Sequence, residues 1–303
     1  MSLTEEEISN YISTFINNNV KLEFDDAEQF TNCMEKLETK VNARVSQRKF
    51  HDTALLRLRE YGIDDMKIIS TGVGYPLRFF DYCNIPNIKE CINIILKLFS
   101  ELDYSAPLDF MGNFGLMYAG DTSKYEGAYF WVNKQAFYRS TIQEREIIYN
   151  NFYIGKTHIN FLLEIDAIAV FDYIGFNKKN LITKYAIAMP YLAFNKRKPL
   201  QHYHDYCNID KVIDMLSVKK DDDWMSLQLT PGIDDYLAIE TFMEKSDFES
   251  YTKFMVDNEL ITMSQYENLC DFDFGELHQF VIKFRWDNKD TFSIKVYTEE
   301  FLK

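Results

Sequence analysis

Alternating apolar and cationic side chains near both ends of the chain limit what it can fold into. Residues 54–59, 280–286 and 292–297 place apolar side chains at alternate positions, with Lys or Arg at several positions between them. Because side chains alternate across a strand, each segment is predicted to form a strand with one apolar and one cationic face.

If the apolar faces of these strands pack under helices, their cations point into a shared interior. The cations are Arg57, Arg59, Lys283, Arg285 and Lys295. In a chain with a formal net charge of -14, they would form a positive island suited to a phosphate-rich small ligand.

The composition excludes a protein that coats nucleic acid, because such binding depends mainly on basic surface. The chain has 47 Asp and Glu against 33 Lys and Arg. No apolar run is long enough to span a bilayer, and residues 1–7 lack the basic and apolar regions of a signal sequence. Five cysteines without a Cys-x-x-Cys pair indicate free thiols in a reducing compartment. We expect a cytoplasmic monomer with no nucleic-acid or membrane partner.

Helical and strand-like patterns alternate along the whole chain. The first predicted helix begins at Thr4. Further helices are predicted over residues 26–45, 88–102, 141–152, 209–216, 248–258 and 264–270. Strand pairs are predicted in residues 53–70, at 110–118 and 127–133, at 159–173 and 181–191, at 224–229 and 236–243, and at 279–286 and 291–297.

These predictions give five hairpins, each preceded by helix, at a spacing of roughly fifty residues that is typical of repeat architectures. Five hairpins supply ten antiparallel strands, which can close into a barrel wide enough to hold a ligand. The predicted fold class is therefore α+β: a ten-stranded antiparallel barrel with helices outside. No linker-like segment interrupts the series, so residues 1–303 are expected to form a single domain.

In its element order the chain resembles the ABBA-type aromatic prenyltransferases, whose barrel is built from repeated α-β-β-α units. At the level of motifs, the likeness rests on residues 127–130, 182–188 and 227–231, and on Lys295 and Tyr297, which resemble the Lys-x-Tyr pairs that the family uses against diphosphate. Where the second hairpin of family members often carries another such pair, this chain has Gly-Ala-Tyr at 127–129.

The resemblance implies transfer of a dimethylallyl or geranyl group from its diphosphate to an electron-rich aromatic small molecule or peptide. Ionising an allylic diphosphate requires cations at the leaving group. The candidates for diphosphate binding are Arg57, Lys184, Lys283, Arg285, Lys295 and Tyr297. Tyr129, Tyr191 and Tyr236 are candidates for shielding the carbocation through their ring faces. Glu164, Asp166 and Glu240 are candidates for contacting the acceptor and taking its proton, and spacing does not choose among them.

Simpler interpretations stay open for each of these residues. Alternating cations are also typical of a solvent-exposed face of a half-buried sheet, and Asp166 and Glu240 could equally neutralise lysines inside the barrel. The alternative function is a non-catalytic effector or binding protein whose cationic face meets an acidic partner. His202 and His204 have metal-like spacing but lie in a predicted helix or loop, so no metal site is predicted. The resemblance implies no required cofactor, and a part for magnesium stays open.

Overall fold

The computed structural model describes most of the chain from Leu55 onward. The described residues are 55–76, 90–91, 94–95, 111–120, 124–132, 143, 146, 149–150, 152–164, 170–190, 202–217, 224–273 and 279–302. The helices predicted from Thr4 and over 26–45 lie outside these ranges, and the helices predicted over 88–102 and 141–152 are described only at single helical residues.

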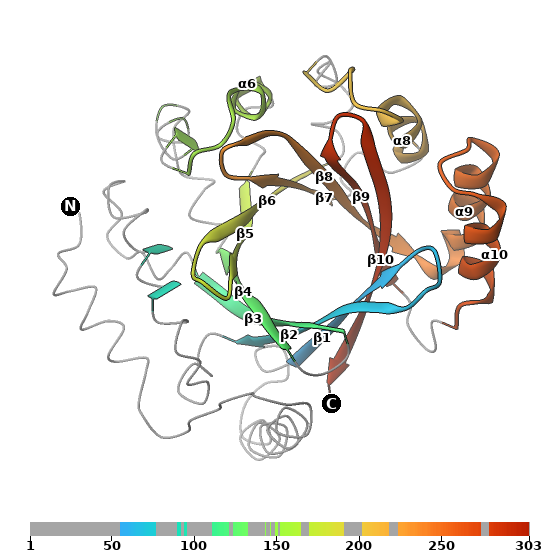
Figure 1. The fold of residues 1–303 in the computed structure, drawn as a ribbon, viewed down its shortest axis with the longest axis horizontal. Coiled ribbons are helices and arrows are strands. Elements are labelled where there is room, and N and C mark those ends of the chain that lie inside the picture. The colour runs from blue at the N-terminus through green and yellow to red at the C-terminus, as the bar shows by residue number, and fades with distance from the viewer. Residues whose placement is uncertain are drawn as a thin grey trace, which may run out of the picture.

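Ten strands form a closed antiparallel barrel, seen end-on in Figure 1. The strands are β1 Leu55–Gly62, β2 Ile68–Pro76, β3 Met111–Ala119, β4 Lys124–Val132, β5 Val170–Asn177, β6 Ile182–Pro190, β7 Trp224–Thr230, β8 Ile233–Glu244, β9 Gln279–Asn288 and β10 Thr291–Leu302. Each strand pairs with its neighbours in sequence, and β1 pairs with β10 to close the circle. The predicted fold class is confirmed.

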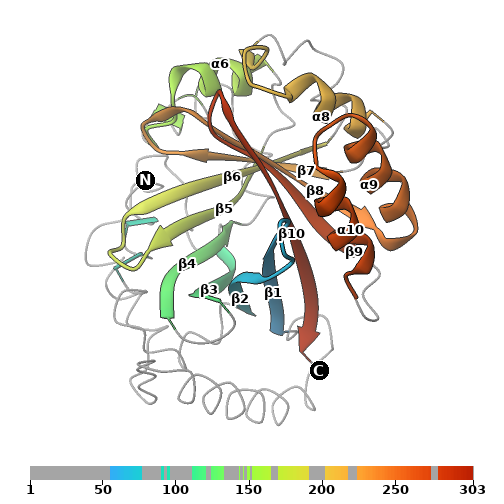
Figure 2. The same ribbon diagram turned by 45° about the vertical axis from the view of Figure 1, so that its right-hand side comes forward.

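Helices lie outside the barrel wall (Figures 1 and 2). The helices whose bounds the structure describes are α6 Lys156–Glu164, α8 Ile209–Leu216, α9 Phe248–Asp257 and α10 Met263–Asp271, with a short 3-10 helix, η6, at Lys245–Asp247. Thr262 and Gln265 form a reciprocal capping box at the start of α10, which satisfies backbone donors that a helix end otherwise leaves unpaired.

One predicted strand is wrong over part of its length. The pattern predicts that residues 159–164 begin the strand 159–173, but they form the last two turns of α6, and β5 begins only at Val170. His158, Ile159, Phe161 and Leu162 are buried, and their spacing is that of one face of a helix. An apolar stretch of this length is ambiguous between helix and strand by pattern alone.

The apolar core lies between the barrel and the helices. Phe280, Ile282, Phe284 and Trp286 of β9 are all buried on the outer face. The ring of Phe248 in α9 packs edge-on against Phe280, with centroids 4.9 Å apart. This packing leaves the opposite side of β9, which carries Lys283, directed toward the barrel interior.

The hairpin turns are tied to the outer segments by hydrogen bonds. Gln265 of α10 donates from Nε2 to Oδ1 of Asp64 in the β1–β2 turn at 2.7 Å. Trp286 donates from its indole nitrogen to the carbonyl of Cys207, just before α8, at 2.7 Å. These contacts fix the helices relative to the strands whose inner faces form the site.

Candidate functional site

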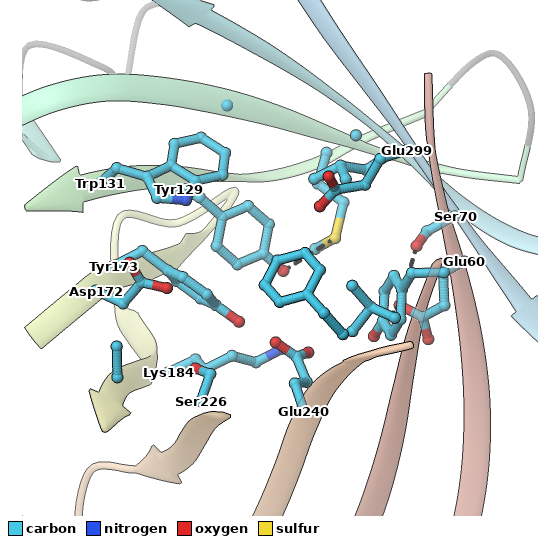
Figure 3. Close-up of a pocket in the computed structure, with 18 of the residues that line it drawn as sticks. Glu60, Ser70, Tyr129, Trp131, Asp172, Tyr173, Lys184, Ser226, Glu240 and Glu299 are labelled. Carbon is cyan, nitrogen blue, oxygen red and sulfur yellow. Dashed lines mark hydrogen bonds between the residues drawn. The ribbon is translucent and has the colours of Figure 1, made fainter. Parts of the chain in front are cut away.

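The barrel encloses a cavity of about 180 Å³, and all ten strands contribute residues to its wall. Carboxylates, an ammonium group and aromatic rings are mixed on this wall (Figure 3). The polar members include Glu60, Asp172, Lys184, Glu240 and Glu299, and the aromatic members include Tyr129, Trp131, Tyr173, Phe242 and Tyr297.

Two lysines face each other in the lumen, and each is neutralised by a carboxylate. Lys283 and Lys295 are direct partners in the β9–β10 register. Nζ of Lys283, which is only 2% exposed, lies 3.1 Å from Oε1 of Glu240. Lys295 pairs with Glu60 of β1. Like charges on adjacent strands repel one another, and here carboxylates compensate them, as the alternative interpretation of Glu240 anticipated.

Glu60 of β1 accepts hydrogen bonds from three residues on its two neighbouring strands, β2 and β10. Besides Lys295, the hydroxyl of Tyr297 donates to its Oε2 at 2.9 Å, and Oγ of Ser70 donates to the same atom at 3.3 Å. Burial opposes the charge of Glu60, but the fields of three lysines and the bond from Lys295 outweigh burial and lower its pKa to about 2. Glu60 is therefore a carboxylate throughout the ordinary pH range.

Ring faces in the lumen already hold ammonium groups. Lys184 lies over the ring of Tyr129, and Lys283 over the ring of Tyr297, each with Nζ 5.7 Å from the ring centroid. This separation is within the range of favourable cation–π contact. The ring of Tyr173 packs edge-on against Tyr129 with centroids 5.3 Å apart, so these side chains form one aromatic wall.

Burial raises the pKa of each of these three phenols, Tyr129, Tyr173 and Tyr297, and nearby carboxylates act in the same direction. All three therefore keep their protons. They can donate hydrogen bonds but do not contribute negative charge to the cavity.

A glycine makes room for the Tyr129 ring. Gly175 of β5 is the register partner of Tyr129, and a Cβ at this position would lie 2.9 Å from Cε1 of Tyr129 and 3.3 Å from Cβ of Lys184. The absent side chain lets the ring lie across the neighbouring strand. Gly72 and Gly115 also line the cavity on this side.

Gln228 of β7 joins the charged and aromatic parts of the wall. It is 0% exposed. Its Oε1 accepts from Nζ of Lys283, and its Nε2 donates to the hydroxyl of Tyr173. Together with the Lys283–Glu240 pair, these two hydrogen bonds make a continuous polar chain from Tyr173 to Glu240 that involves β5, β7, β8 and β9.

The structure brings together about half of the residues that the sequence singled out. Lys184, Lys283, Lys295, Glu240, Tyr129 and Tyr297 lie in or directly beside the cavity. Arg285 and Tyr236 lie nearer the hairpin turns, with the guanidinium 5.7 Å from the Tyr236 ring centroid. Nε of Arg285 also donates to Asp287 at 2.7 Å. Neither residue lines the cavity within the part of the chain that the structure describes.

Glu164 does not reach the cavity. It lies at the end of the outer helix α6, with its side chain 52% exposed and Oε1 3.2 Å from Nε2 of His202. Asp166, Tyr191 and the side chain of Arg57 lie outside the described residues.

The expectation that the cations of the first strand point into the lumen is wrong for Arg59. Leu58 and Glu60 line the cavity, so by alternation Arg59 lies on the opposite face of β1. The register explains the reversal, because Glu60 is opposite Tyr297 and Leu58 opposite Glu299, and partners across a ladder share a face.

Sequence reasoning missed Glu60, Tyr173 and Gln228. For Glu60 there was a usable signal: the next apolar residues after Leu58 are Tyr61 and Ile63, so the apolar side of the pattern changes at this point. For Tyr173 and Gln228 no local signal exists, because their relation depends on β5 and β7 both flanking β6.

No described helix has the length and apolarity needed to cross a membrane. Among the residues that the structure places, no three His, Cys, Asp or Glu side chains gather closely enough to hold a metal ion.

Comparison with known proteins yields structural likeness at very low identity. No family model and no curated protein matches the chain. The chain is similar to 5-dimethylallyltryptophan synthase from Streptomyces coelicolor, with 7% identity, a TM-score of 0.48, and coverage of 99% of this chain and 97% of that one. It is also similar to 6-dimethylallyltryptophan synthase from Micromonospora olivasterospora in complex with DMASPP and Trp, with 8% identity, a TM-score of 0.45, and coverage of 82% and 81%. At these values the likeness carries no argument about activity, which must come from the cavity itself.

Proposed function

We propose that the protein transfers a prenyl group from an allylic isoprenoid diphosphate to an electron-rich aromatic acceptor. One observation carries the proposal: a single cavity combines ring faces that already hold ammonium groups at 5.7 Å with a carboxylate that stays ionised. Ionisation of an allylic diphosphate needs cations for the leaving group, ring faces for the carbocation and a polar contact for the acceptor.

The lysines would hold the diphosphate. Lys283 and Lys295 are adjacent across β9 and β10, and Lys184 lines the cavity and acts electrostatically on the same carboxylate, Glu60. As the allylic C–O bond breaks, its electron pair leaves with the diphosphate, and ammonium groups placed beforehand stabilise the growing charge. The anion must compete with Glu60 and Glu240 for these lysines, so its affinity should be moderate.

The aromatic wall would protect the carbocation. Tyr129, Tyr173 and Tyr297 present neutral rings to the cavity. Each ring face attracts a cation by about 0.5–2 kcal/mol and offers no strong nucleophile in place of the acceptor. The π electrons of the acceptor then form the new bond to the prenyl carbon.

Glu240 would contact the acceptor. Glu60 already accepts bonds from Lys295, Tyr297 and Ser70, whereas Glu240 has one ion-pair partner, Lys283, among the described residues. A carboxylate offers about four lone-pair positions, so Glu240 has capacity left for an N–H or O–H of the acceptor. The ring proton lost after bond formation would pass to this carboxylate.

The alternative of a binding protein with an outer cationic face is less well supported. The lysines that suggested it, Lys283 and Lys295, are 2% and 18% exposed and turn toward the barrel interior. They are not available to a flat surface of an acidic partner.

The test is mass spectrometry after incubation with dimethylallyl or geranyl diphosphate and a panel of indoles, phenols and Tyr- or Trp-containing peptides. We expect an acceptor whose mass increases by that of one prenyl group less a proton. Dimethylallyl thiodiphosphate, which is hydrolysed slowly, should also raise the melting temperature, because it binds only the folded chain. Absence of both product and thermal shift would contradict the proposal.

A further inference from the structure

The hydrogen-bond directions in the polar chain of the lumen follow from one lysine. An ammonium group has donors and no acceptor. Nζ of Lys283 contacts Oε1 of both Gln228 and Glu240, so the carbonyl side of the Gln228 amide must face the lysine. The amide oxygen and nitrogen of Gln228 are similar in shape, but only the oxygen can accept from an ammonium group, so the orientation of the amide is fixed.

The same orientation fixes the hydroxyl of Tyr173. Since the Gln228 oxygen faces Lys283, its Nε2 faces Tyr173 and can only donate. The Tyr173 oxygen accepts this bond, and the phenolic proton must point elsewhere. Gln228 is fully buried, so water does not offer it another arrangement.

Tyr173 differs in this respect from two other tyrosines of the wall. The hydroxyl of Tyr297 donates a hydrogen bond to Glu60 at 2.9 Å, and the hydroxyl of Tyr129 donates one to Sδ of Met117 at 3.1 Å. Within the described residues, the Tyr173 hydroxyl has one hydrogen-bonding contact, the Gln228 amide. Figure 3 shows its oxygen directed into the cavity.

We propose that Tyr173 is a hydrogen-bond donor to an anionic oxygen of the cavity ligand, and that Gln228 is the positioning residue that fixes the direction of this bond. The nearby ammonium groups of Lys184 and Lys283 favour an oxyanion as the acceptor. That this oxyanion belongs to an allylic diphosphate rests on the proposed function. In that case the bond strengthens as the C–O electron pair moves onto the leaving oxygen, and no proton is transferred.

Isothermal titration with inorganic pyrophosphate and with dimethylallyl thiodiphosphate tests the donor. Tyr173→Phe removes the proton and keeps the ring, so both anions should bind about tenfold more weakly. Tyr153→Phe is the matched control, because this tyrosine is 75% exposed and its loss should leave both affinities unchanged. Melting curves establish that each variant is folded.

A double-mutant cycle tests the positioning role. Gln228→Glu keeps the length of the side chain but has no donor when ionised, so it should accept from both Lys283 and Tyr173 and turn the phenolic proton away from the cavity. The added charge weakens anion binding by itself, and the cycle removes this effect. Tyr173→Phe should cost about tenfold with Gln228 present and less than twofold in the Gln228→Glu background. Equal costs in the two backgrounds would overturn the role of Gln228.

The possible outcomes separate this inference from the proposed function. If the parent binds thiodiphosphate and folded Tyr173→Phe binds it equally well, the donor role is wrong. The proposal of prenyl transfer is not contradicted by that result. If Tyr173→Phe weakens pyrophosphate binding while the parent forms no prenylated product, the donor role stands and the proposed function is wrong. A parent that binds neither anion would contradict both.

Discussion

Glu60 depends on its cationic neighbours for its charge. Its folded pKa of about 2 lies below the ordinary value of 4.5. A lowered carboxylate pKa contributes stability that is fully present above about pH 4.5 and is lost as the pH falls toward about 2. The shift corresponds to a contribution on the order of 3 kcal/mol.

Glu60→Gln should therefore destabilise the protein at pH 7 by an amount of this order, and the difference from the parent should shrink below about pH 4.5. Gln resembles the protonated acid, so the two proteins become more alike as Glu60 titrates. Urea unfolding of both proteins between pH 7 and pH 3 checks this. A difference that stays constant over the whole range would mean that the lysines do not act on Glu60 as described.

Glu240 should affect anion binding and turnover in opposite directions. Glu240→Gln removes the carboxylate that competes for Lys283, so dimethylallyl thiodiphosphate should bind several-fold more tightly, by roughly 1 kcal/mol. Under the proposed function Glu240 takes the proton of the acceptor, so the same change should lower turnover by roughly 10²–10⁴-fold. Calorimetry and product formation measure the two effects separately.

Glu267→Gln is the matched control for this substitution. Glu267 is exposed on the outer helix α10, so its neutralisation changes the net charge equally without touching the lumen. A Glu240→Gln protein that binds thiodiphosphate less tightly than the Glu267→Gln control would show that Glu240 does not compete with the anion.

At the scale of elements, β4 and β5 are packed together by a glycine. Gly175→Ala would place a Cβ 2.9 Å from the Tyr129 ring, so the ring must shift. We expect a loss of about 1–3 kcal/mol in the free energy of unfolding. Gly72→Ala is the matched control, since its nearest contact would be an ordinary 3.4 Å to Cβ of Leu58.

Chemical denaturation of both glycine variants measures the difference. Gly72→Ala should be neutral or slightly stabilising, because alanine restricts the unfolded chain. Equal destabilisation of the two variants would mean that the space at Gly175 has no special relation to Tyr129.

The alternation of apolar and charged residues predicts the inward face of β9 and β10 but not that of β1. In β9 and β10 the residues on either side of Lys283 and Lys295 in the sequence are buried and apolar, so both faces could be predicted from alternation. In β1, both alternate sets contain apolar residues, so alternation does not show which set points inward; the set with Leu58 and Glu60 does. The pairing of β1 with β10 determines which side chains of β1 point inward, and the sequence of β1 alone contains no information about that register.

The ion pairs of the site could not be predicted for a related reason. Alternation tells which residues share a strand face, but Glu60 and Lys295 are joined only when β1 meets β10 at the closing seam. The possibility that Glu240 neutralises a lysine could be stated from composition. Its partner, Lys283, could be assigned only from the β8–β9 register.

At the scale of the whole molecule, closure of the barrel depends on the pairing of residues 55–62 with residues 295–302. Deleting residues 299–303 removes the partners of the first four residues of β1. This exposes unpaired backbone groups, which recruit other chains. We expect the truncated protein to aggregate at concentrations at which the parent remains dispersed.

Size-exclusion chromatography with light scattering at matched concentrations checks this expectation. A truncated protein that elutes at the parent's size and keeps its affinity for thiodiphosphate would show that the seam needs fewer pairs than the register provides. The matched control is removal of Lys303 alone, which leaves the whole of β10 in place.

The cavity wall is divided around the circumference of the barrel. Gly72, Gly115 and Tyr129 line the cavity on β2 to β4, whereas Glu60 lines it on β1 and the ion-paired Lys295 and Lys283 lie beside it on the contiguous strands β10 and β9. Different strands therefore limit the shape of a bound ligand and interact with its charge. Changes on the glycine side can therefore alter which molecules fit the cavity while the ionic side is retained, so the shape and the charge of the cavity can change independently.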